Sequence, residues 1–222
     1  MELYDHDFWI IGGGRVGHIA VDRLLKRHGP EAFLVVDRER APLLNFMETK
    51  VHVKCMDGIQ FLAYRLAPAA PPRWIIPALP EHLAFEWIRL KLAATASVEM
   101  LPVPEWAVLG MPHPMKGKGG AVYASIADFR CPDDCPEPKN LCTHTGRPRP
   151  LVLHEHLAGL RKEGWRVVVI RSVQLAPGVG GFRPRALFDA LARASEGPGR
   201  MLLATACKCH GVIHAYRVGG KP

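Results

Sequence analysis

The sequence predicts a protein of the α/β class, with a parallel sheet that carries helices on both faces. Short apolar runs typical of buried strands alternate with amphipathic stretches typical of helices. A run of glycines directly follows the first apolar run, where a strand of a parallel sheet turns into a helix. The chain has 222 residues, 48% of them hydrophobic, which is enough for a substantial core.

The first forty residues contain the clearest pattern. DFWIIGGG (7–14) is an apolar strand that ends in glycines, and RVGHIAVDRLLKRHG (15–29) follows with its apolar residues on one helical stripe. AFLVVDRER (32–40) is a second buried strand that runs up to Asp37. The order strand, glycine turn, helix, strand and acid predicts a Rossmann-like dinucleotide-binding domain.

The glycine turn fits the spacing G-x-G-x-x-G. The first glycine permits a tight turn, the second lets the backbone approach a pyrophosphate, and the third lets helix and strand pack closely. The pyrophosphate would then lie at the positive N-terminal end of the helix. The residues expected to bind the cofactor here are Gly12, Gly13, Gly14, Arg15, Val16 and Gly17.

Two acidic residues are further candidates for contacts with the dinucleotide. Asp37 lies twenty residues after Gly17 and is placed to accept a ribose 2′-hydroxyl, which favours NAD. Arg38 follows it and could tolerate a 2′-phosphate, so NADP stays possible. Asp57, after a third expected strand over residues 50–58, could approach adenine or ribose, although an Asp before a glycine is equally typical of a turn.

The strand and helix pattern continues to about residue 108. We expect a fourth strand over 73–80, an amphipathic helix over 81–94 and a fifth strand over 97–105. Cys55, in the third expected strand, is expected to be a small buried hydrophobe. Residues 1–108 are therefore predicted to form the dinucleotide-binding domain.

A family resemblance supports this interpretation. The stretches IIGGGRVGHIAVDRLLKR, FLVVDRE, VKCMDG and WIIPALP resemble the nucleotide-binding domains of RCK-type potassium-uptake regulators. They are also similar to the NAD-binding domain of precorrin-2 dehydrogenases. The resemblance covers residues 7–105 and implies an NAD-binding Rossmann fold. RCK domains are usually dimeric, so the resemblance also implies a homo-oligomer.

Residues 109–150 form a predicted cysteine-rich loop region. Cys131, Cys135 and Cys142 follow the spacing C-x3-C-x6-C, and the first two each precede a proline. Neighbouring thiolates oxidise readily and repel one another, and binding a metal removes both problems. Cysteines beside prolines in an irregular loop favour an iron–sulfur cluster. Zinc is the alternative, with His144 close in sequence, and an inert structural loop is the remaining one.

Residues 151–222 are predicted to form a C-terminal α/β extension. Its expected elements are a helix over 151–165, a strand over 166–175, a glycine turn with a helix, and a strand over 200–218. On that last strand Cys207 and Cys209 would face the same side and His210 the other. Either cysteine could supply a fourth metal ligand, with two apolar core cysteines as the alternative.

Composition and charge limit the partners. The net charge is +8 and the pI about 9.4, yet the basic residues are scattered, so nucleic acid is not an expected partner. No apolar run approaches the roughly 20 residues that span a bilayer. The first residues, MELYDHDFWIIGGG, have acids where a signal peptide has basic residues. We therefore expect a cytoplasmic protein without a membrane span.

Together these features predict an NAD(H)-binding redox protein with a cysteine-ligated iron–sulfur or zinc site. It would be an oxidoreductase or an electron-transfer subunit that works with a redox partner protein. The alternative is an NAD-sensing regulator of RCK type with a structural or redox-sensing metal site. An NAD(P)-dependent oxidoreductase is the enzyme class to test, but no catalytic residue is identified, and no Ser-His-Asp elbow is present.

Overall fold

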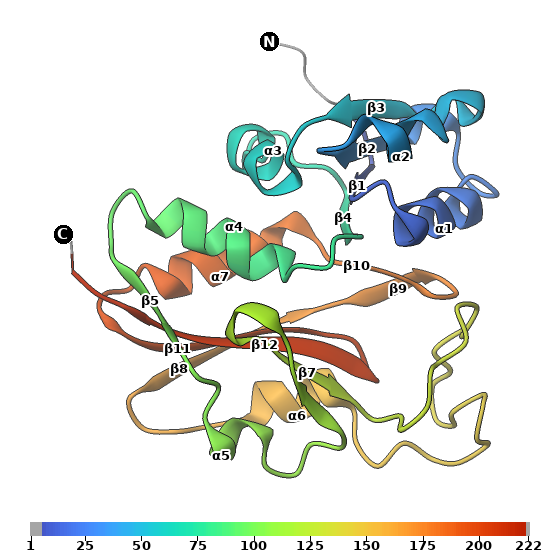
Figure 1. The fold of residues 1–222 in the computed structure, drawn as a ribbon. Coiled ribbons are helices and arrows are strands. Elements are labelled where there is room, and N and C mark those ends of the chain that lie inside the picture. The colour runs from blue at the N-terminus through green and yellow to red at the C-terminus, as the bar shows by residue number, and fades with distance from the viewer. Residues whose placement is uncertain (1–5, 221–222) are drawn as a thin grey trace.

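The computed structural model describes residues 6–220 and contains two main sheets separated by a pair of helices (Figure 1). The first sheet has four parallel strands in the order β3-β2-β1-β4. Their bounds are β1 (Phe8–Ile11), β2 (Phe33–Asp37), β3 (His52–Cys55) and β4 (Trp74–Pro77). This is the strand order expected for one half of a doubly wound sheet.

Helices cover both faces of this sheet. They are α1 (Arg15–Leu24), α2 (Arg40–Leu44), α3 (Gly58–Arg65) and α4 (Leu83–Leu92). Because side chains alternate along a strand, Phe8 and Ile10 join the cluster of buried residues that contains α1, whereas Trp9 and Ile11 join the cluster of α3 and α4. The predicted α/β class, with a parallel sheet flanked by helices, is confirmed.

The second sheet is mixed and larger. Its strands lie in the order β6-β7-β12-β11-β8, with β5 also paired to β12. Their bounds are β5 (Val98–Leu101), β6 (Pro114–Lys116), β7 (Val122–Ser125), β8 (Trp165–Arg171), β11 (Gly199–Ala206) and β12 (His210–Val218). Only the β8–β11 pair is parallel.

The helices α4 and α7 (Pro184–Ala194) lie between the two sheets, as Figure 1 shows. One cluster of buried residues runs through this layer and includes Trp9 of the first sheet, Leu187 of α7 and Met201 of the second sheet. Two short helices, α5 (Glu105–Val108) and α6 (Leu153–Gly159), contribute to the core on the other face of the second sheet. The two sheets are thus held together by shared apolar packing.

A two-stranded ribbon, β9 (Val173–Ala176) and β10 (Val179–Gly181), connects the sheets further. Beyond it, Phe182 exchanges two backbone hydrogen bonds with Ile75 of β4. Single turns of 3-10 helix complete the regular structure: η1 (Pro30–Ala32), η2 (Met47–Thr49) and η3 (Lys118–Gly120). No helix between residues 6 and 220 combines the length and apolar character that crossing a bilayer requires.

Several elements differ from the expectations. The strand expected over 97–105 forms as β5 but pairs with β12 in the second sheet. The expected strand over 166–175 is divided into β8 and β9, which belong to different sheets. The helix expected over 151–165 is limited to α6. The two differences in the strands share a cause, because local periodicity says nothing about which distant strand a segment pairs with.

The single strand expected over 200–218 is wrong. The segment is a hairpin of β11 and β12, closed by a hydrogen bond from the N–H of Cys207 to the carbonyl of His210. A 19-residue strand would far exceed the usual length of roughly 3–10 residues. Cys207 and Cys209 therefore lie in a tight turn, not on a strand.

Candidate functional site

The glycine turn after β1 has the geometry that its spacing predicts. Gly12 adopts a φ of +117°, and a Cβ there would lie 2.4 Å from the carbonyl oxygen of Ala78. A Cβ on Gly17 would lie 2.1 Å from the carbonyl oxygen of Gly12. Gly14 precedes α1, and a Cβ there would meet nothing within 4 Å. Two glycines are thus required by packing, and the third faces open space at the start of α1.

Asp37 lies beside this turn. Its carboxylate accepts the backbone N–H groups of Gly13 at 2.7 Å and Glu39 at 2.9 Å. Arg38 is exposed and lies 3.7 Å from the carboxylate of Glu39. The residues expected around a dinucleotide at the ends of β1 and β2 are therefore close together. Val16, in the first turn of α1, is 46% exposed.

Asp57 and Cys55 have other surroundings. Asp57 caps α3, since its carboxylate accepts the N–H groups of Ile59 at 3.0 Å and Gln60 at 2.9 Å. The structure thus shows Asp57 in a local structural role, in line with the turn-forming alternative to a contact with adenine or ribose. Cys55 is exposed, with its Sγ 3.4 Å from the carbonyl of Arg38, so the expectation of a buried hydrophobe is wrong.

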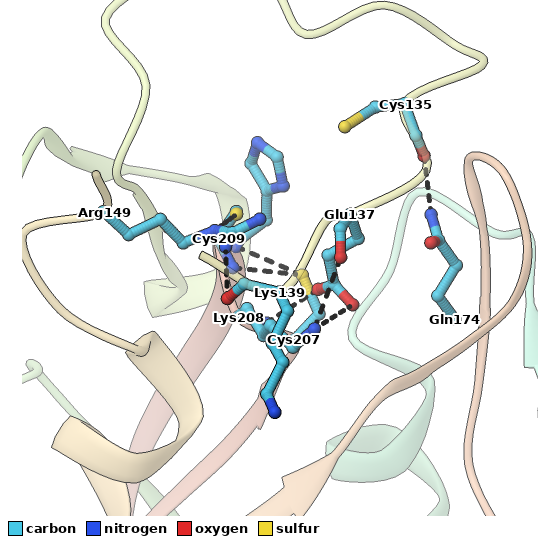
Figure 2. Close-up of polar contacts among 9 residues, drawn as sticks. Cys135, Glu137, Lys139, Arg149, Gln174, Cys207, Lys208 and Cys209 are labelled. Atoms are coloured by element: carbon cyan, nitrogen blue, oxygen red, sulfur yellow. Dashed lines mark hydrogen bonds and ion pairs between the residues drawn. The ribbon is translucent and has the colours of Figure 1, made fainter. Parts of the chain in front are cut away.

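The other five cysteines line one cavity of about 480 Å³, which we call the thiol cavity. They come from two distant segments: Cys131, Cys135 and Cys142 from the irregular stretch between β7 and α6, and Cys207 and Cys209 from the hairpin turn. Figure 2 shows the second segment beside Glu137 and Arg149. The wall also includes Arg15 and Val16 of α1. The five predicted thiols therefore line one cavity, whose wall also includes the first turn of α1.

The hairpin turn directs two backbone N–H groups at the sulfur of Cys207. Its Sγ accepts the backbone N–H of Cys209 at 3.4 Å and that of His210 at 3.3 Å. Two amides aimed at one sulfur favour a thiolate. Burial nevertheless dominates and raises the pKa of Cys207 to about 12, so the group is a neutral thiol near pH 7.

Cys142 has the same arrangement in a second turn. The N–H of Cys142 donates to the carbonyl of Arg147 at 2.9 Å, and the N–H of Gly146 donates to the carbonyl of Cys142 at 2.8 Å. Hydrogen bonds from the backbone and the hydroxyl of Thr145, with a smaller one from His144, lower the pKa of Cys142. Each turn thus directs N–H groups from residues two and three positions later at a cysteine sulfur.

The remaining three thiols complete the lining. Cys131 Sγ lies 3.5 Å from Nε2 of His210, and its pKa is raised by burial and then by the nearby thiols of Cys135, Cys209 and Cys142. Cys209 Sγ accepts the Nε–H of Arg149 at 2.9 Å. Burial raises the pKa of Cys209 despite this cation. Four of the five sulfurs are thus close enough to interact electrostatically.

Polar contacts hold the cysteine-bearing segment in place, as Figure 2 shows. Glu137 accepts the backbone N–H of Lys208 at 2.9 Å, and the carbonyl of Cys135 accepts Nε2 of Gln174 at 2.6 Å. The N–H of Gly178 donates to the same carbonyl at 3.1 Å. A Cβ on Gly178 would lie 1.7 Å from the carbonyl oxygen of Asp133, so only glycine fits where the segment crosses the β9–β10 turn.

Sequence reasoning missed three residues of this site. His210 was placed on the opposite side from the cysteines, but it lines the thiol cavity, because the chain turns at Lys208. Arg149 and Glu137 were not singled out. None of the four residues of the turn, Cys207 to His210, is of a type that favours turns, so the local sequence gives no signal for the position of His210.

Within residues 6–220, no group of three or more His, Cys, Asp or Glu side chains is already close enough together to hold a metal ion. The donor chemistry nevertheless fits a thiophilic metal, since five sulfurs share one cavity and two of them are set in N–H-donating turns.

The fold and site define an α/β protein with a glycine turn on its first sheet and a thiol cavity beside it. Residues 84–219 match the family model AF_1314_C, described as "Uncharacterized protein, C-terminal domain", and the chain belongs to this family. The matched region begins in α4 and includes all five cysteines of the thiol cavity.

The chain is also similar to an "Uncharacterized protein" of Archaeoglobus fulgidus. The two are 27% identical over 94% of this chain and 98% of the relative. The similarity therefore extends over both sheets. No solved structure matches the chain.

Proposed function

We propose that this protein binds NAD(H) at the glycine turn and holds a cysteine-ligated iron–sulfur cluster in the thiol cavity. It would act as an oxidoreductase or as an electron-transfer subunit that delivers electrons to a partner protein. One observation carries the proposal: Arg15 and Val16, from the first turn of α1, line the same cavity as the five cysteines. A dinucleotide at the start of α1 would therefore lie next to the sulfurs.

The glycine turn supports the nucleotide half of the proposal. The free N–H groups at the start of α1 and its positive dipole end would receive the pyrophosphate, with Gly14 leaving room for it. Asp37 would accept a hydrogen bond from a ribose hydroxyl, which would favour NAD, and exposed Arg38 keeps NADP open. The likeness to RCK and precorrin-2 dehydrogenase nucleotide-binding domains supports the same assignment.

The two N–H-donating turns support the metal half. Cys142 and Cys207 would be the preorganised ligands, and two of the three remaining thiols, those of Cys131, Cys135 and Cys209, would supply the other two positions. Backbone N–H groups on the sulfurs, together with the Arg149 guanidinium on Cys209, offset the negative charge that several thiolates accumulate. When bound, the cluster supplies one-electron chemistry. Zinc is the alternative occupant.

The experiment that tests this proposal is anaerobic purification of the full chain, followed by metal and acid-labile sulfide analysis and by titration with NADH and NADPH. Iron with sulfide in near-equal amounts, and tighter binding of NADH, would support the cluster and the NAD assignment. A protein that contains zinc and no iron would instead indicate a structural or sensing metal site.

A second candidate is an NAD-sensing regulator with a redox-sensing metal site. The ion pair between Arg15 of α1 and Asp133 of the cysteine-bearing segment favours it, because a ligand at α1 could change the position of that segment. In that case NADH would change the alkylation rates of the cavity cysteines without being oxidised. Turnover with an added electron acceptor separates the two candidates.

A further inference from the structure

A second cavity, of about 330 Å³, lies at the carboxyl end of β4, and we call it the β4 cavity. It is bounded on one side by the residues between β4 and α4, and on the other by β7, β11 and β12. Ser172, Cys207 and His210 line both this cavity and the thiol cavity. The two spaces therefore share a wall that carries a proposed metal ligand.

The lining of the β4 cavity suits a small uncharged molecule. Most of it is apolar, with Leu79, Leu83 and Phe182 among its residues. None of the described residues that line it is a lysine or an arginine, and Glu81 is the acid at its rim. Such a lining does not favour a phosphate or a carboxylate, which would lose hydration without gaining a cation. Apolar walls with a few polar groups are typical of sites for organic ligands.

One lining residue, His82, forms a buried pair with His214. Nδ1 of His82 is 2.9 Å from Nδ1 of His214, and Nε2 of His82 is 2.9 Å from Oγ1 of Thr205. Both rings are buried, and the ring of Phe85 stacks on His214 at 4.2 Å. Burial lowers the pKa of both histidines, so both rings are neutral near pH 7.

The direction of the hydrogen bonds follows from this neutrality. A neutral imidazole has one donor and one acceptor nitrogen. We assign the proton of His214 to the ring nitrogen opposite His82, because an interaction with the backbone of Gly119 raises the pKa of His214 against the larger effect of burial; its Nδ1 then accepts from His82. His82 then donates through Nδ1, and its Nε2 must accept the hydroxyl proton of Thr205. The Thr205 oxygen keeps lone pairs, and the histidine pair fixes it as an acceptor.

We propose that the β4 cavity binds a small uncharged alcohol, whose hydroxyl donates a hydrogen bond to Thr205. The histidine pair is the positioning element that makes Thr205 select donors over acceptors. Binding itself does not depend on the proposed function. A redox role for the alcohol rests on that function: the alcohol would lose a hydride to NAD+ and a proton to solvent, and would become a carbonyl compound. Small uncharged alcohols are thus the substrate class, which the glycine turn and the thiols do not identify.

A matched pair of probes tests the inference. Cyclohexanol and cyclohexanone have nearly the same shape, but only the alcohol donates a hydrogen bond. Titration of the full chain, followed by ligand-observed NMR, should show cyclohexanol binding roughly three- to tenfold more tightly than cyclohexanone, as expected for one hydrogen bond. Equal affinities, or no binding of either probe, would overturn the inference.

Three variants locate the effect. Thr205→Val should abolish the preference for the alcohol, and Thr205→Ser, which keeps the hydroxyl, should retain it. The matched control Thr95→Val removes a hydroxyl that bonds to Leu92, away from both cavities, and should keep the preference. A preference that survives in Thr205→Val would contradict the assignment.

The same samples separate this inference from the proposed function. Gly14→Val and Cys142→Ser should lose NADH and metal respectively while keeping the preference for cyclohexanol. If the wild-type protein binds NADH and metal but does not distinguish the probes, the alcohol site is refuted alone. If it distinguishes the probes but binds neither NADH nor metal, only the proposed function fails.

Discussion

Arg15, the first residue of α1, forms an ion pair with Asp133, which lies between two cysteines of the thiol cavity. The nearby Arg23 donates to the backbone carbonyl of Asp133 at 2.5 Å. The helix that follows the glycine turn is therefore tied to the cysteine-bearing segment, although 118 positions separate Arg15 from Asp133. This contact joins the two halves of the proposed redox site.

Breaking this contact should affect the thiols more than stability. The two side chains are 59% and 45% exposed, so Arg15→Ala or Asp133→Asn should cost less than about 1 kcal/mol of unfolding free energy. Alkylation of Cys131 and Cys135 should become faster, because the segment between them is less restrained. Mass spectrometry of alkylated peptides measures this rate. The control Arg185→Ala, which removes an exposed pair within α7, should leave it unchanged.

Gly14→Val should abolish NADH binding without unfolding the protein. The new side chain enters open space in the folded chain but would occupy the position expected for the pyrophosphate. Gly159→Val is the matched control, since a Cβ there also meets nothing within 4 Å. Calorimetric titration should show loss of NADH binding in the first variant alone. Unchanged affinity in Gly14→Val would show that the phosphate assignment is wrong.

Among the five cavity thiols, Cys142 should alkylate fastest and Cys207 slowest in reduced, metal-free protein at pH 7.5. Hydrogen bonds from Thr145 lower the pKa of Cys142, whereas burial raises the pKa of Cys207 to about 12. The thiolate is the reactive form, so the rates follow these pKa values. Thr145→Val should slow the alkylation of Cys142, while the distant Thr49→Val should leave that rate unchanged. Peptide mapping after iodoacetamide treatment gives the individual rates. The opposite order would contradict the pKa shifts that we assign to Cys142 and Cys207.

The buried histidines predict that metal-free protein loses stability as the pH falls below about 6.5. Burial, followed by the charge of His214, depresses the pKa of His82 in the folded state. Its contribution is therefore fully present above the unfolded pKa of 6.5 and is lost as the pH falls toward the folded value. The loss approaches about 1.4 kcal/mol per pH unit for one such group.

Urea unfolding at pH 7.5, 6.5 and 5.5 checks this dependence. His82→Gln should reduce the change in unfolding free energy with pH, because Gln does not titrate. This holds even if the variant is less stable at every pH. His52→Gln, at an exposed position in β3, should keep the wild-type slope. A stability that does not change between pH 7.5 and 5.5 would contradict the neutral state of the pair.

Local sequence signals were sufficient for the first sheet. The glycine spacing and the acid after β2 depend on contacts between neighbouring elements, such as the N–H of Gly13 on Asp37, so a short stretch of sequence contains them. The gathering of the cysteines could be expected from their chemistry, but not its geometry. Cys142 and Cys207 act through turns whose N–H groups come from residues two and three positions later, which residue types alone do not specify.

The long-range features could not be predicted in this way. The pairing of β5 with β12 and the position of α4 and α7 between two sheets depend on packing between distant segments. The His82–His214 contact joins residues 132 positions apart, and neither residue belongs to a recognisable motif. Such relationships become visible only when the strands are placed in three dimensions.

The most direct test of the account is the metal and sulfide content of the anaerobically purified chain, measured together for wild type, Cys142→Ser, Cys207→Ser and Cys55→Ser. Cys55 lies outside the thiol cavity and provides the matched control. The account predicts a brown wild-type protein with iron and sulfide, retained in Cys55→Ser and lost or strongly reduced in the other two variants. A wild-type protein without bound metal, or full metal content in both Cys142→Ser and Cys207→Ser, would contradict it.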